Sequence, residues 1–261
     1  METPFRYAVA LVLGIAVTAC LAQAADLTAD QVRDALAAAS SAAPARLRGK
    51  DLSSLDLSRV DFKGADLSGA SLFGSKLVLA KLAGANLSGA NLNGAWLMGT
   101  DFSGANLSNA MLMSVVVVGG EVTQRPKFAN ANLSGARIIA ELDGADLSGA
   151  NLSKARIGVD IRNQGMGQMR TNLTGANLSS CDLSGADLNR SLLRFANLRG
   201  ARLRGANLFR ADLSGADLTG ADLTGADLTE VDLDAAILKG VVGLGSVKGL
   251  DQALNLDRAV R

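Results

Sequence analysis

Five carboxylates recur at intervals of about twenty residues in the middle of the sequence. They are Asp101, Glu121, Glu141, Asp160 and Asp182. If they lie one above another at the spacing of stacked strands, about 4.8 Å, neighbouring charges repel by roughly 1 kcal/mol in water. Such a strip of oxygen atoms suits a cation, although no segment matches a dedicated calcium-binding loop. We therefore expect a surface lattice of ion pairs here; a candidate cation- or ligand-binding acidic strip, without a dedicated metal site, is the alternative.

Three arginines accompany these carboxylates, and no residue pattern nearby points to catalysis. Arg137 and Arg156 are expected on the adjoining side of the chain, and Arg162 follows Ile161, so these three are candidate flanking cations. The chain has no histidine, which removes the usual general base near neutral pH and the commonest metal ligand. It has no nucleophile elbow, phosphate-binding loop or zinc-ligand spacing. We expect a protein that is not an enzyme and uses no cofactor.

These side chains must be positioned by a five-residue repeat, which is clearest in "ADLSGADLTGADLTGADLTEVDL" from Ala211 to Leu233. The central leucine and the alanine two residues before it are apolar, and a polar residue separates them, as in a short strand. Serine or threonine and glycine then form a corner. A period of five cannot continue a flat strand, because five is odd, and it would drift around an α-helix. The chain must turn at every repeat.

The units "ADLSG", "ANLSG" and "ADLTG" resemble those of the pentapeptide-repeat family over roughly residues 51–238. The resemblance implies an all-β fold, a right-handed four-sided parallel β-helix with one unit per side and twenty residues per coil. Residues twenty apart would then be vertical neighbours. Stacking would supply both backbone hydrogen bonds and burial, so that no disulfide is needed.

A solenoid needs caps at its open ends. "LTADQVRDALAAAS" predicts a helix that Thr28 and Gln31 begin as a capping box, with Leu27, Val32 and Leu36 on one side. After the repeats, a segment with Leu250, Leu254 and Leu256 is expected to fold over the last coil. We predict an N-terminal helical cap at 25–50, the β-helix at 51–238 and a C-terminal cap at 239–261.

Central residues stand four apart rather than five in "VVGGEV", "RIIAEL" and "RIGVDI", at Val118–Val122, Ile138–Leu142 and Ile157–Ile161. Their spacing predicts three short corners that stack directly. Longer segments, "TQRPK" and "RNQGMGQMRTN", follow the first and third. This irregular region, residues 96–171, is the predicted functional edge.

Two further surfaces are candidates for binding. An apolar patch is expected to attract a partner, or to be covered by a loop of the chain itself; it comprises Trp96, Met98, Met111, Met113 and Val117. A basic band precedes an acidic coil, with Arg202 expected to face Asp222; its members are Arg190, Arg194, Arg199, Arg202, Arg204 and Arg210. The two bands either neutralise each other or bind an anionic polymer or lipid headgroup.

Residues 1–24 resemble an export signal. Arg6 precedes an apolar run that is too short to span a bilayer, and "AQA" ending at Ala24 suits cleavage. Alternatively, "VTAC" resembles a lipobox, in which Cys20 would carry a lipid anchor. In either case Cys181 has no partner within the chain, and we expect it to be a small buried thiol.

The balance of charge limits the classes of partner. Lys and Arg number 26 and Asp and Glu number 25, so a net charge of +1 argues against nucleic acid. We predict an exported scaffold or binding module that presents flat walls to an envelope protein or anionic polymer, either periplasmic or secreted. A lipid-anchored structural protein is an alternative. Some members of the resembled family are cytoplasmic DNA mimics that protect topoisomerases, but the export signal and neutral charge disfavour that function.

Overall fold

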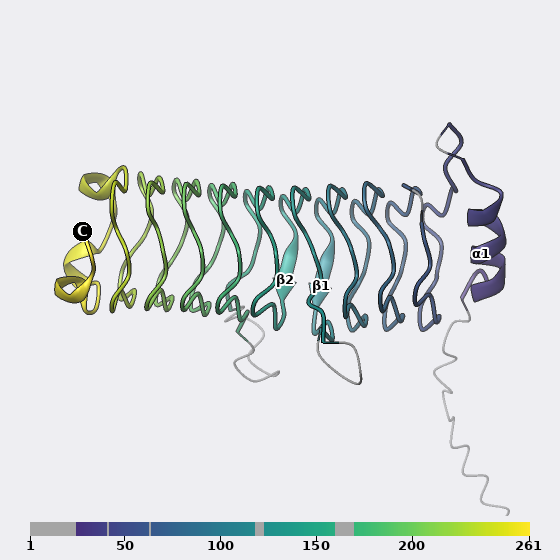
Figure 1. The fold of residues 1–261 in the computed structure, drawn as a ribbon, viewed down its shortest axis with the longest axis horizontal. Coiled ribbons are helices and arrows are strands. Elements are labelled where there is room, and N and C mark those ends of the chain that lie inside the picture. Colours follow the sequence, from purple (N-terminus) through teal and green to yellow (C-terminus); the bar gives the residue numbers. More distant parts are fainter. Residues whose placement is uncertain (1–24, 41, 63, 118–122, 160–169) are drawn as a thin grey trace, which may run out of the picture.

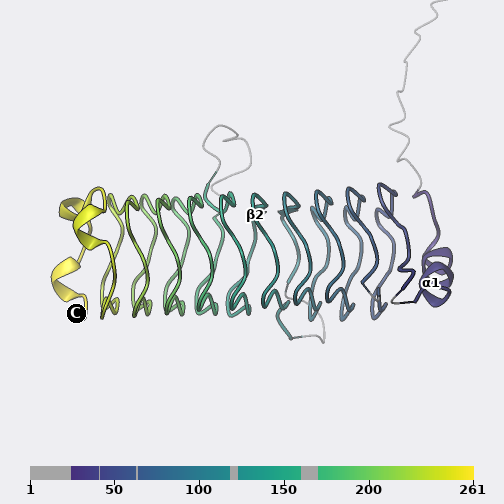
Figure 2. The same ribbon diagram turned by 90° about the horizontal axis from the view of Figure 1, so that it is seen from above.

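The chain is wound into a long rod of stacked coils, a β-helix (Figure 1). Its structure, a computed structural model, describes residues 25–40, 42–62, 64–117, 123–159 and 170–261. Helix α1 (Ala29–Ala37) lies at one end, and the C-terminus lies at the other, where the 3-10 helices η2 (Leu244–Ser246), η3 (Leu250–Gln252) and η4 (Leu256–Arg258) follow one another. A view from above shows the same stack (Figure 2).

The unit that starts at Ala211 shows why the chain turns every five residues. Ala211 and Leu213 are buried, while Asp212 between them is half-exposed and pairs with the next coil. Ser214 and Gly215 form the corner, and Gly215 has a φ of 68°, which favours glycine. Asp212 Oδ1 accepts a hydrogen bond from the Ser214 backbone N–H at 3.0 Å. The polar residue of the unit therefore also stabilises its corner.

Parallel bridges between successive coils fall into four columns of outward-facing residues. Column 1 consists of Arg46, Asp66, Asn86, Asn106, Asn132, Asn151, Asp182, Arg202, Asp222 and Val242. Column 2 consists of Asp51, Ser71, Asn91, Met111, Arg137, Arg156, Asp187, Asn207, Asp227 and Lys248. Column 3 consists of Asp56, Lys76, Trp96 and Val116, and continues through Glu141, Asn172, Leu192, Asp212, Asp232 and Leu254. Column 4 consists of Asp61, Lys81, Asp101, Lys127, Asp146, Asn177, Asn197, Asp217, Ile237 and Val260.

Where pairing is longest, strands β1 (Met111–Met113) and β2 (Arg137–Ile139) run parallel in adjacent coils. The core between the columns is a stack of buried leucines and alanines. Phe102 and Phe128 replace leucine in adjacent coils, and their rings stack with centroids 5.1 Å apart. The repeat thus places one large and one small apolar side chain per unit inside the rod, as its sequence predicts.

Two long steps and one short step interrupt the regular spacing. Val116 of column 3 is followed on column 4 by Lys127, and Arg156 of column 2 is followed on column 3 by Asn172. Between them, the step from Arg137 to Glu141 is one residue shorter than a regular step. The columns nevertheless continue on both sides of each irregular step, so the additional residues are accommodated between strands and not within them.

The prediction of three stacked short corners is therefore wrong. The Ile138–Leu142 spacing does make a short corner, since Arg137 and Glu141 occupy consecutive columns. The other two spacings fall in the long steps, and Val118, Val122 and Ile161 lie outside the described residues. Their four-residue spacing does not set the register of the coils.

Buried Thr171 directly precedes Asn172, where column 3 resumes after the second long step. Its hydroxyl is 2.9 Å from the carbonyl oxygen of Ile138 and 2.7 Å from that of Ile157. A regular unit has alanine at this position. The hydroxyl therefore lies within hydrogen-bond distance of one carbonyl group of the preceding coil, that of Ile138, and one of its own coil, that of Ile157, at the point where the column pattern resumes.

At the N-terminal end, α1 begins with the predicted capping box. Thr28 N–H donates to Gln31 Oε1 at 2.8 Å, and Gln31 N–H donates to Thr28 Oγ1 at 3.2 Å. Val32 and Leu36 are buried, and Leu27 packs against the same core. These predictions are confirmed: one face of the helix is apolar and continues the core of the first coil.

At the other end, residues 239–261 form a further layer of the coil with wider corners. Val242, Lys248, Leu254 and Val260 each pair with the coil below, six residues apart. The additional residue in each corner lets a 3-10 helix form there. Leu250 and Leu256 pack against the core, but Leu254 is 52% exposed because it holds an outward bridge position. Of the three leucines that the sequence singles out in this segment, Leu254 is therefore the one that faces outward.

Candidate functional site

The predicted acidic strip does not form. Asp101 lies on column 4, Glu141 on column 3 and Asp182 on column 1. Glu121 and Asp160 lie outside the described residues. Three members on three different columns cannot bind one cation together, so the prediction of a single acidic column is wrong.

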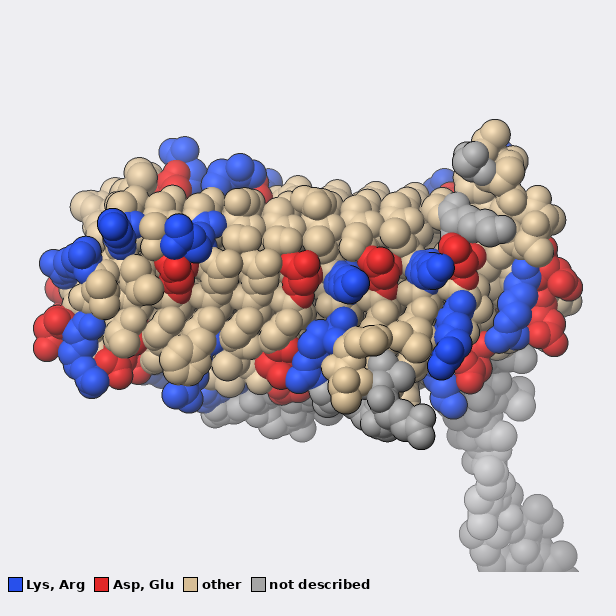
Figure 3. Space-filling model, viewed as in Figure 1, with Lys and Arg blue, Asp and Glu red and all other residues tan. Residues whose placement is uncertain are grey.

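The error arises from the two long steps. A constant twenty-residue count places Glu121 above Asp101, but Lys127 holds that position on column 4. The same count places Asp160 below Asp182, where the bridge partner is Asn151. Lys127 also removes the expected repulsion between carboxylates. The charges on column 4 alternate in sign along Asp61, Lys81, Asp101 and Lys127. Figure 3 shows acidic and basic side chains alternating in a row along one face.

The predicted flanking cations lie together but have no acidic strip to flank. Arg137 and Arg156 are bridge partners in adjacent coils of column 2. Arg162 lies outside the described residues. In the next coil, the column continues with Asp187. The structure thus confirms that two of the arginines stack, while their predicted relation to five carboxylates is lost.

The predicted apolar patch is only partly exposed. Met98 and Val117 are only 4% and 1% exposed, whereas Trp96 is 41% exposed and Met111 36%; Met113 is half-buried. Val117 faces inward because Val116, not Val117, holds the outward bridge position.

Met98 is buried beside a segment of the chain itself. Gly99 N–H donates to the carbonyl oxygen of Gln124 at 2.8 Å, which places Gln124 against this corner, next to Met98. The alternative in which the chain covers its own patch therefore holds for Met98. Trp96 stays accessible, with the Lys76 ammonium 5.8 Å from its ring centroid.

The basic band pairs with the acidic coil, as its first interpretation predicts. Arg194, Arg199 and Arg204 lie 3.7, 3.0 and 3.6 Å from Asp212, Asp217 and Asp222 in the next coil. Arg210 contacts Glu230 through two nitrogens, at 2.7 and 3.2 Å. Arg202 does not bind the predicted Asp222 but contacts Asp182 in the preceding coil at 3.1 Å. Such exposed pairs are individually weak.

The carboxylates of these pairs are held in their ionised form. Burial alone would raise the pKa of Asp182, but hydrogen bonds from Ser184 and Arg202 outweigh it and lower the pKa. Asp227 behaves alike: burial opposes ionisation, while Lys248 and Thr229 donate to it and lower its pKa. These acids are committed to corners and ion pairs, which leaves them little capacity for another ligand.

A groove of about 740 Å³ runs along column 2 where the wall becomes irregular. From the column itself it is lined by Arg137, Arg156, Asp187, Asn207, Asp227 and Lys248. Gly158, Asn189, Arg190 and Phe209 line it from the adjoining corners. We call this the column 2 groove.

The corner at Gly158 shapes one end of the column 2 groove. Gly158 N–H donates to the carbonyl oxygen of Asp187 at 2.7 Å, and Val159 N–H donates to that of Asn189 at 3.2 Å. A Cβ atom on Gly158 would lie 2.7 Å from Asn189 N and closer still to the Asn189 amide. Because Gly158 has no side chain, this corner can pack closely onto the next coil, which contains Asp187 and Asn189.

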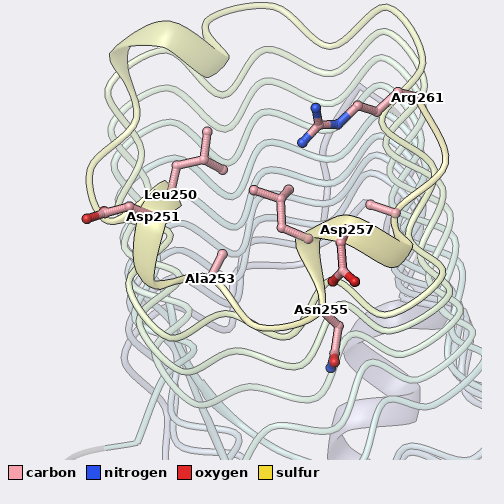
Figure 4. A pocket seen from close by; sticks show the side chains of 8 residues that line it. Leu250, Asp251, Ala253, Asn255, Asp257 and Arg261 are labelled. Carbon is pink, nitrogen blue, oxygen red and sulfur yellow. The ribbon is translucent and has the colours of Figure 1, made fainter.

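A second hollow, of about 660 Å³, lies at the C-terminal end (Figure 4). Leu250 and Arg261 point across it, and Asp251 points away from it. It is the open end of the last coil, with apolar and polar lining residues alternating around the rim. Its residues do not converge on any point as ligand-binding groups would.

Other chemistry is sparse within the described residues. Cys181 is buried, its thiol donates to the carbonyl oxygen of Leu147 at 2.8 Å, and burial raises its pKa to about 12. The predicted buried thiol is confirmed. In the described part of the chain, no three Cys, Asp or Glu side chains gather as a metal site would require. No described helix is long and apolar enough to cross a membrane.

Sequence reasoning missed most of the column 2 groove. Asn189, Phe209 and Lys248 were not candidates, although "ANLFR" does place Phe209 where a regular unit has serine or threonine. Arg190 was assigned to the neutralised basic band, but it makes no ion pair with any residue that the structure describes. A departure from the repeat at an outward or corner position was the available signal.

Comparisons with known proteins agree with this architecture. The family model "Pentapeptide repeats" matches in eight copies, over residues 45–74, 80–116, 140–157, 171–208 and 206–242. The structure of HetL, a pentapeptide repeat protein involved in heterocyst differentiation regulation from the cyanobacterium Nostoc sp. strain PCC 7120, is similar at 32% identity and a TM-score of 0.52. The match covers 90% of this chain and 94% of HetL.

Two further solved structures share less with the chain. A pentapeptide repeat protein from the Arabidopsis thaliana thylakoid lumen is 34% identical over 43% of this chain and 65% of that protein, with a TM-score of 0.26. QnrB1, a plasmid-mediated fluoroquinolone resistance protein, is 19% identical over 80% and 90% of the two chains, with a TM-score of 0.37. None of the curated proteins compared with the chain matches it. From the matched repeats and the similarity to HetL, the chain belongs to the pentapeptide-repeat family, and its fold is a right-handed β-helix.

Proposed function

We propose that this protein is an exported, non-catalytic binding module that holds an envelope partner against the side of its rod. The observation that carries this proposal is the column 2 groove, which opens where the step from Arg156 to Asn172 interrupts an otherwise regular wall. Most of the rod surface around the groove consists of tight corners and of charged side chains that are paired with each other. The groove offers a partner both depth and charge.

The proposal treats the rest of the rod as a frame. Its four columns correspond to four flat walls, with the β-helix at 51–238 between an N-terminal cap at 25–50 and a C-terminal cap at 239–261. Support for the capping roles comes from α1, which buries Val32 and Leu36, and from the C-terminal layer, where Leu250 and Leu256 pack on the core. Many polar side chains of the frame are engaged in corners, ladders or ion pairs, which supports a role without catalysis.

Export to the periplasm, or secretion, is proposed from residues 1–24, which lie outside the described residues. The test is N-terminal sequencing of the protein recovered from a periplasmic extract. A mature chain that begins at Ala25 is the expected result. A lipid-modified N-terminal Cys20 would instead indicate an anchored form, and an uncleaved chain in the cytoplasm would contradict export.

Binding through the column 2 groove can be tested by photo-crosslinking in living cells. A photoreactive residue in place of Asn207 in the groove should give a crosslinked species. The matched control is Asn197 on column 4, which occupies the same position of a unit on another wall. Equal crosslinking at both positions, or none at Asn207, would contradict the proposed site.

A further inference from the structure

Among the described residues that line the column 2 groove, charges are unequal, with four cations and two carboxylates. The cations are Arg137, Arg156, Arg190 and Lys248, and the carboxylates are Asp187 and Asp227. Elsewhere on the rod, basic and acidic side chains are matched closely, and the whole chain carries only +1. A local excess of cations in a concave site favours an anionic ligand.

Both carboxylates of the groove are already engaged. Asp187 Oδ1 accepts hydrogen bonds from the Asn189 side chain at 2.8 Å and from the Asn207 side chain at 2.9 Å. Asp227 Oδ2 accepts from Lys248 Nζ at 2.7 Å, and Asp227 Oδ1 accepts from Thr229 N at 3.0 Å. Lys248 thus compensates the charge of Asp227, whereas Asp187 is held by neutral amides and makes no ion pair with Arg156 within the described residues.

Two arginines of the groove are available to a ligand. Arg156 is exposed and makes no side-chain hydrogen bond or ion pair with the described residues. Arg190 likewise makes no side-chain hydrogen bond or ion pair with the described residues. Its charge helps to lower the pKa of Glu230, but Glu230 is already bound by Arg210 through two nitrogens. A guanidinium presents a planar pair of N–H groups that fits a carboxylate or phosphate.

The shape of the groove favours an extended ligand. Its six column 2 residues, Arg137 to Lys248, belong to six successive coils, so at about 4.8 Å per coil the row is roughly 24 Å long. Phe209 is half-buried in the groove, with the Arg210 guanidinium 4.9 Å from its ring centroid. An aromatic face suits the apolar face of a sugar ring, and the second N–H of the Asn207 amide can donate to a hydroxyl.

We propose that the column 2 groove binds a linear acidic glycan, a polysaccharide with carboxylate or phosphate groups repeated along it. Arg156 and Arg190 bind its anionic groups, and Phe209, one coil beyond Arg190, packs against a neighbouring sugar ring. This inference rests on the proposed function, because it names the partner of that binding module.

The experiment measures binding of purified mature protein to defined polymers by calorimetry. The probes are oligogalacturonate of about ten units, a phosphorylated mannan fragment of similar length, uncharged dextran and poly-L-glutamate. Binding to one or both acidic glycans, with dextran and polyglutamate much weaker, is expected. The first two probes distinguish carboxylate from phosphate. Equal binding of polyglutamate, or no binding of either acidic glycan, would overturn the proposal.

Variants locate the site. Arg156→Gln with Arg190→Gln should raise the Kd at least about tenfold, since each lost charged hydrogen bond is worth on the order of a tenfold change. Arg199→Gln with Arg204→Gln removes the same charge outside the groove and should change the Kd less than about twofold. Equal weakening by both pairs would mean non-specific attraction and overturn the site.

A second pair of variants covers the case in which the glutamine pair is unfolded, and one outcome separates the glycan proposal from the binding-module proposal. If the glutamine pair does not fold, Arg156→Lys with Arg190→Lys keeps the charge but loses the planar fork, and should still weaken binding. Crosslinking at Asn207 in cells together with no glycan binding in vitro would overturn the glycan and leave the binding module. Absence of both would overturn the binding module as well.

Discussion

At the scale of single residues, Asp66 illustrates how a polar side chain of the repeat stabilises the fold. The side chain and backbone N–H of Ser68 both donate to it and hold its pKa below the usual range. Asn86 in the next coil donates to the same oxygen at 3.1 Å, and Asn106 donates to Asn86 in turn. Aspartate and asparagine therefore fill the same position, and only aspartate adds a titrating charge.

This difference predicts how stability depends on pH. Asp66, Asp182 and Asp227 all have folded pKa values below the ordinary one of about 3.9. Folding therefore favours the carboxylate. The stabilisation is complete above about pH 4 and is lost as the pH falls through the folded values. The thermal midpoint should drop between pH 4 and pH 2.

Asp66→Asn supplies the matched variant for that prediction. It keeps the acceptor that Asn86 and Asn106 use in the same column, so its midpoint at pH 7 should stay close to that of the wild type. Between pH 4 and pH 2 its midpoint should fall less than that of the wild type. Identical falls, measured by circular dichroism, would show that Asp66 does not contribute.

Gly158 supplies a second prediction at this scale. A Cβ atom there would meet Asn189, so Gly158→Ala should destabilise the fold by roughly 1–3 kcal/mol. Gly245→Ala is the control, because its Cβ would have open space around it, and it should change stability by less than about 0.5 kcal/mol. Urea unfolding measures both, and similar values for the two variants would refute the packing described for the Gly158 corner.

At the scale of elements, α1 differs from the rest of the rod because only one of its faces is buried. Val32 and Leu36 point into the core, while Arg33 lies outside and donates to the Asp56 carbonyl oxygen at 3.0 Å. A β-helix with an open end exposes apolar side chains of its last layer and unpaired backbone groups. The helix supplies apolar contacts at this end without offering an edge to another chain.

Leu36→Ala should therefore weaken the N-terminal end. Truncating a buried leucine costs about 2–5 kcal/mol, and partial opening of the helix should promote self-association of rods. Ala35→Ser, on the exposed side of the same helix, should change neither property. Chemical unfolding and sedimentation measure the two effects. A Leu36→Ala protein as stable and monomeric as the control would refute the proposed capping role.

At the scale of the whole molecule, the rod behaves as a stack in which each coil contacts its two neighbours. Its stability should then depend on neighbouring layers and little on total length. Removing Ala176–Phe195 deletes one coil and places Asn197 on Asp146, and Arg202 on Asn151. None of the new column partners pairs like charges.

This deletion should leave one cooperative unfolding transition and a rod shorter by about 4.8 Å, the spacing of one coil. Small-angle scattering measures the length, and circular dichroism follows unfolding. A deleted protein without β-structure would show that the coils are not interchangeable. Retained structure at unchanged length would contradict the twenty-residue coil.

The repeat made the architecture predictable and also caused the main error about the site. Spacing alone identified the buried leucines, the corner glycines and the capping box of Thr28, since each follows from local sequence. The position of Glu121 or Asp160 depends on how many residues leave the wall before Lys127 and Asn172. That count follows from which strand pairs with which, a long-range property that a five-residue pattern cannot determine.

The long step between Arg156 and Asn172 has a consequence for engineering. Neighbouring coils keep their register on both sides of it, so additional residues between two strands do not disturb the stacking of the rod. Foreign peptides, such as epitopes or affinity handles, could be spliced into other junctions between walls at chosen heights. The number of coils between two insertion points would then set the distance between the inserted peptides.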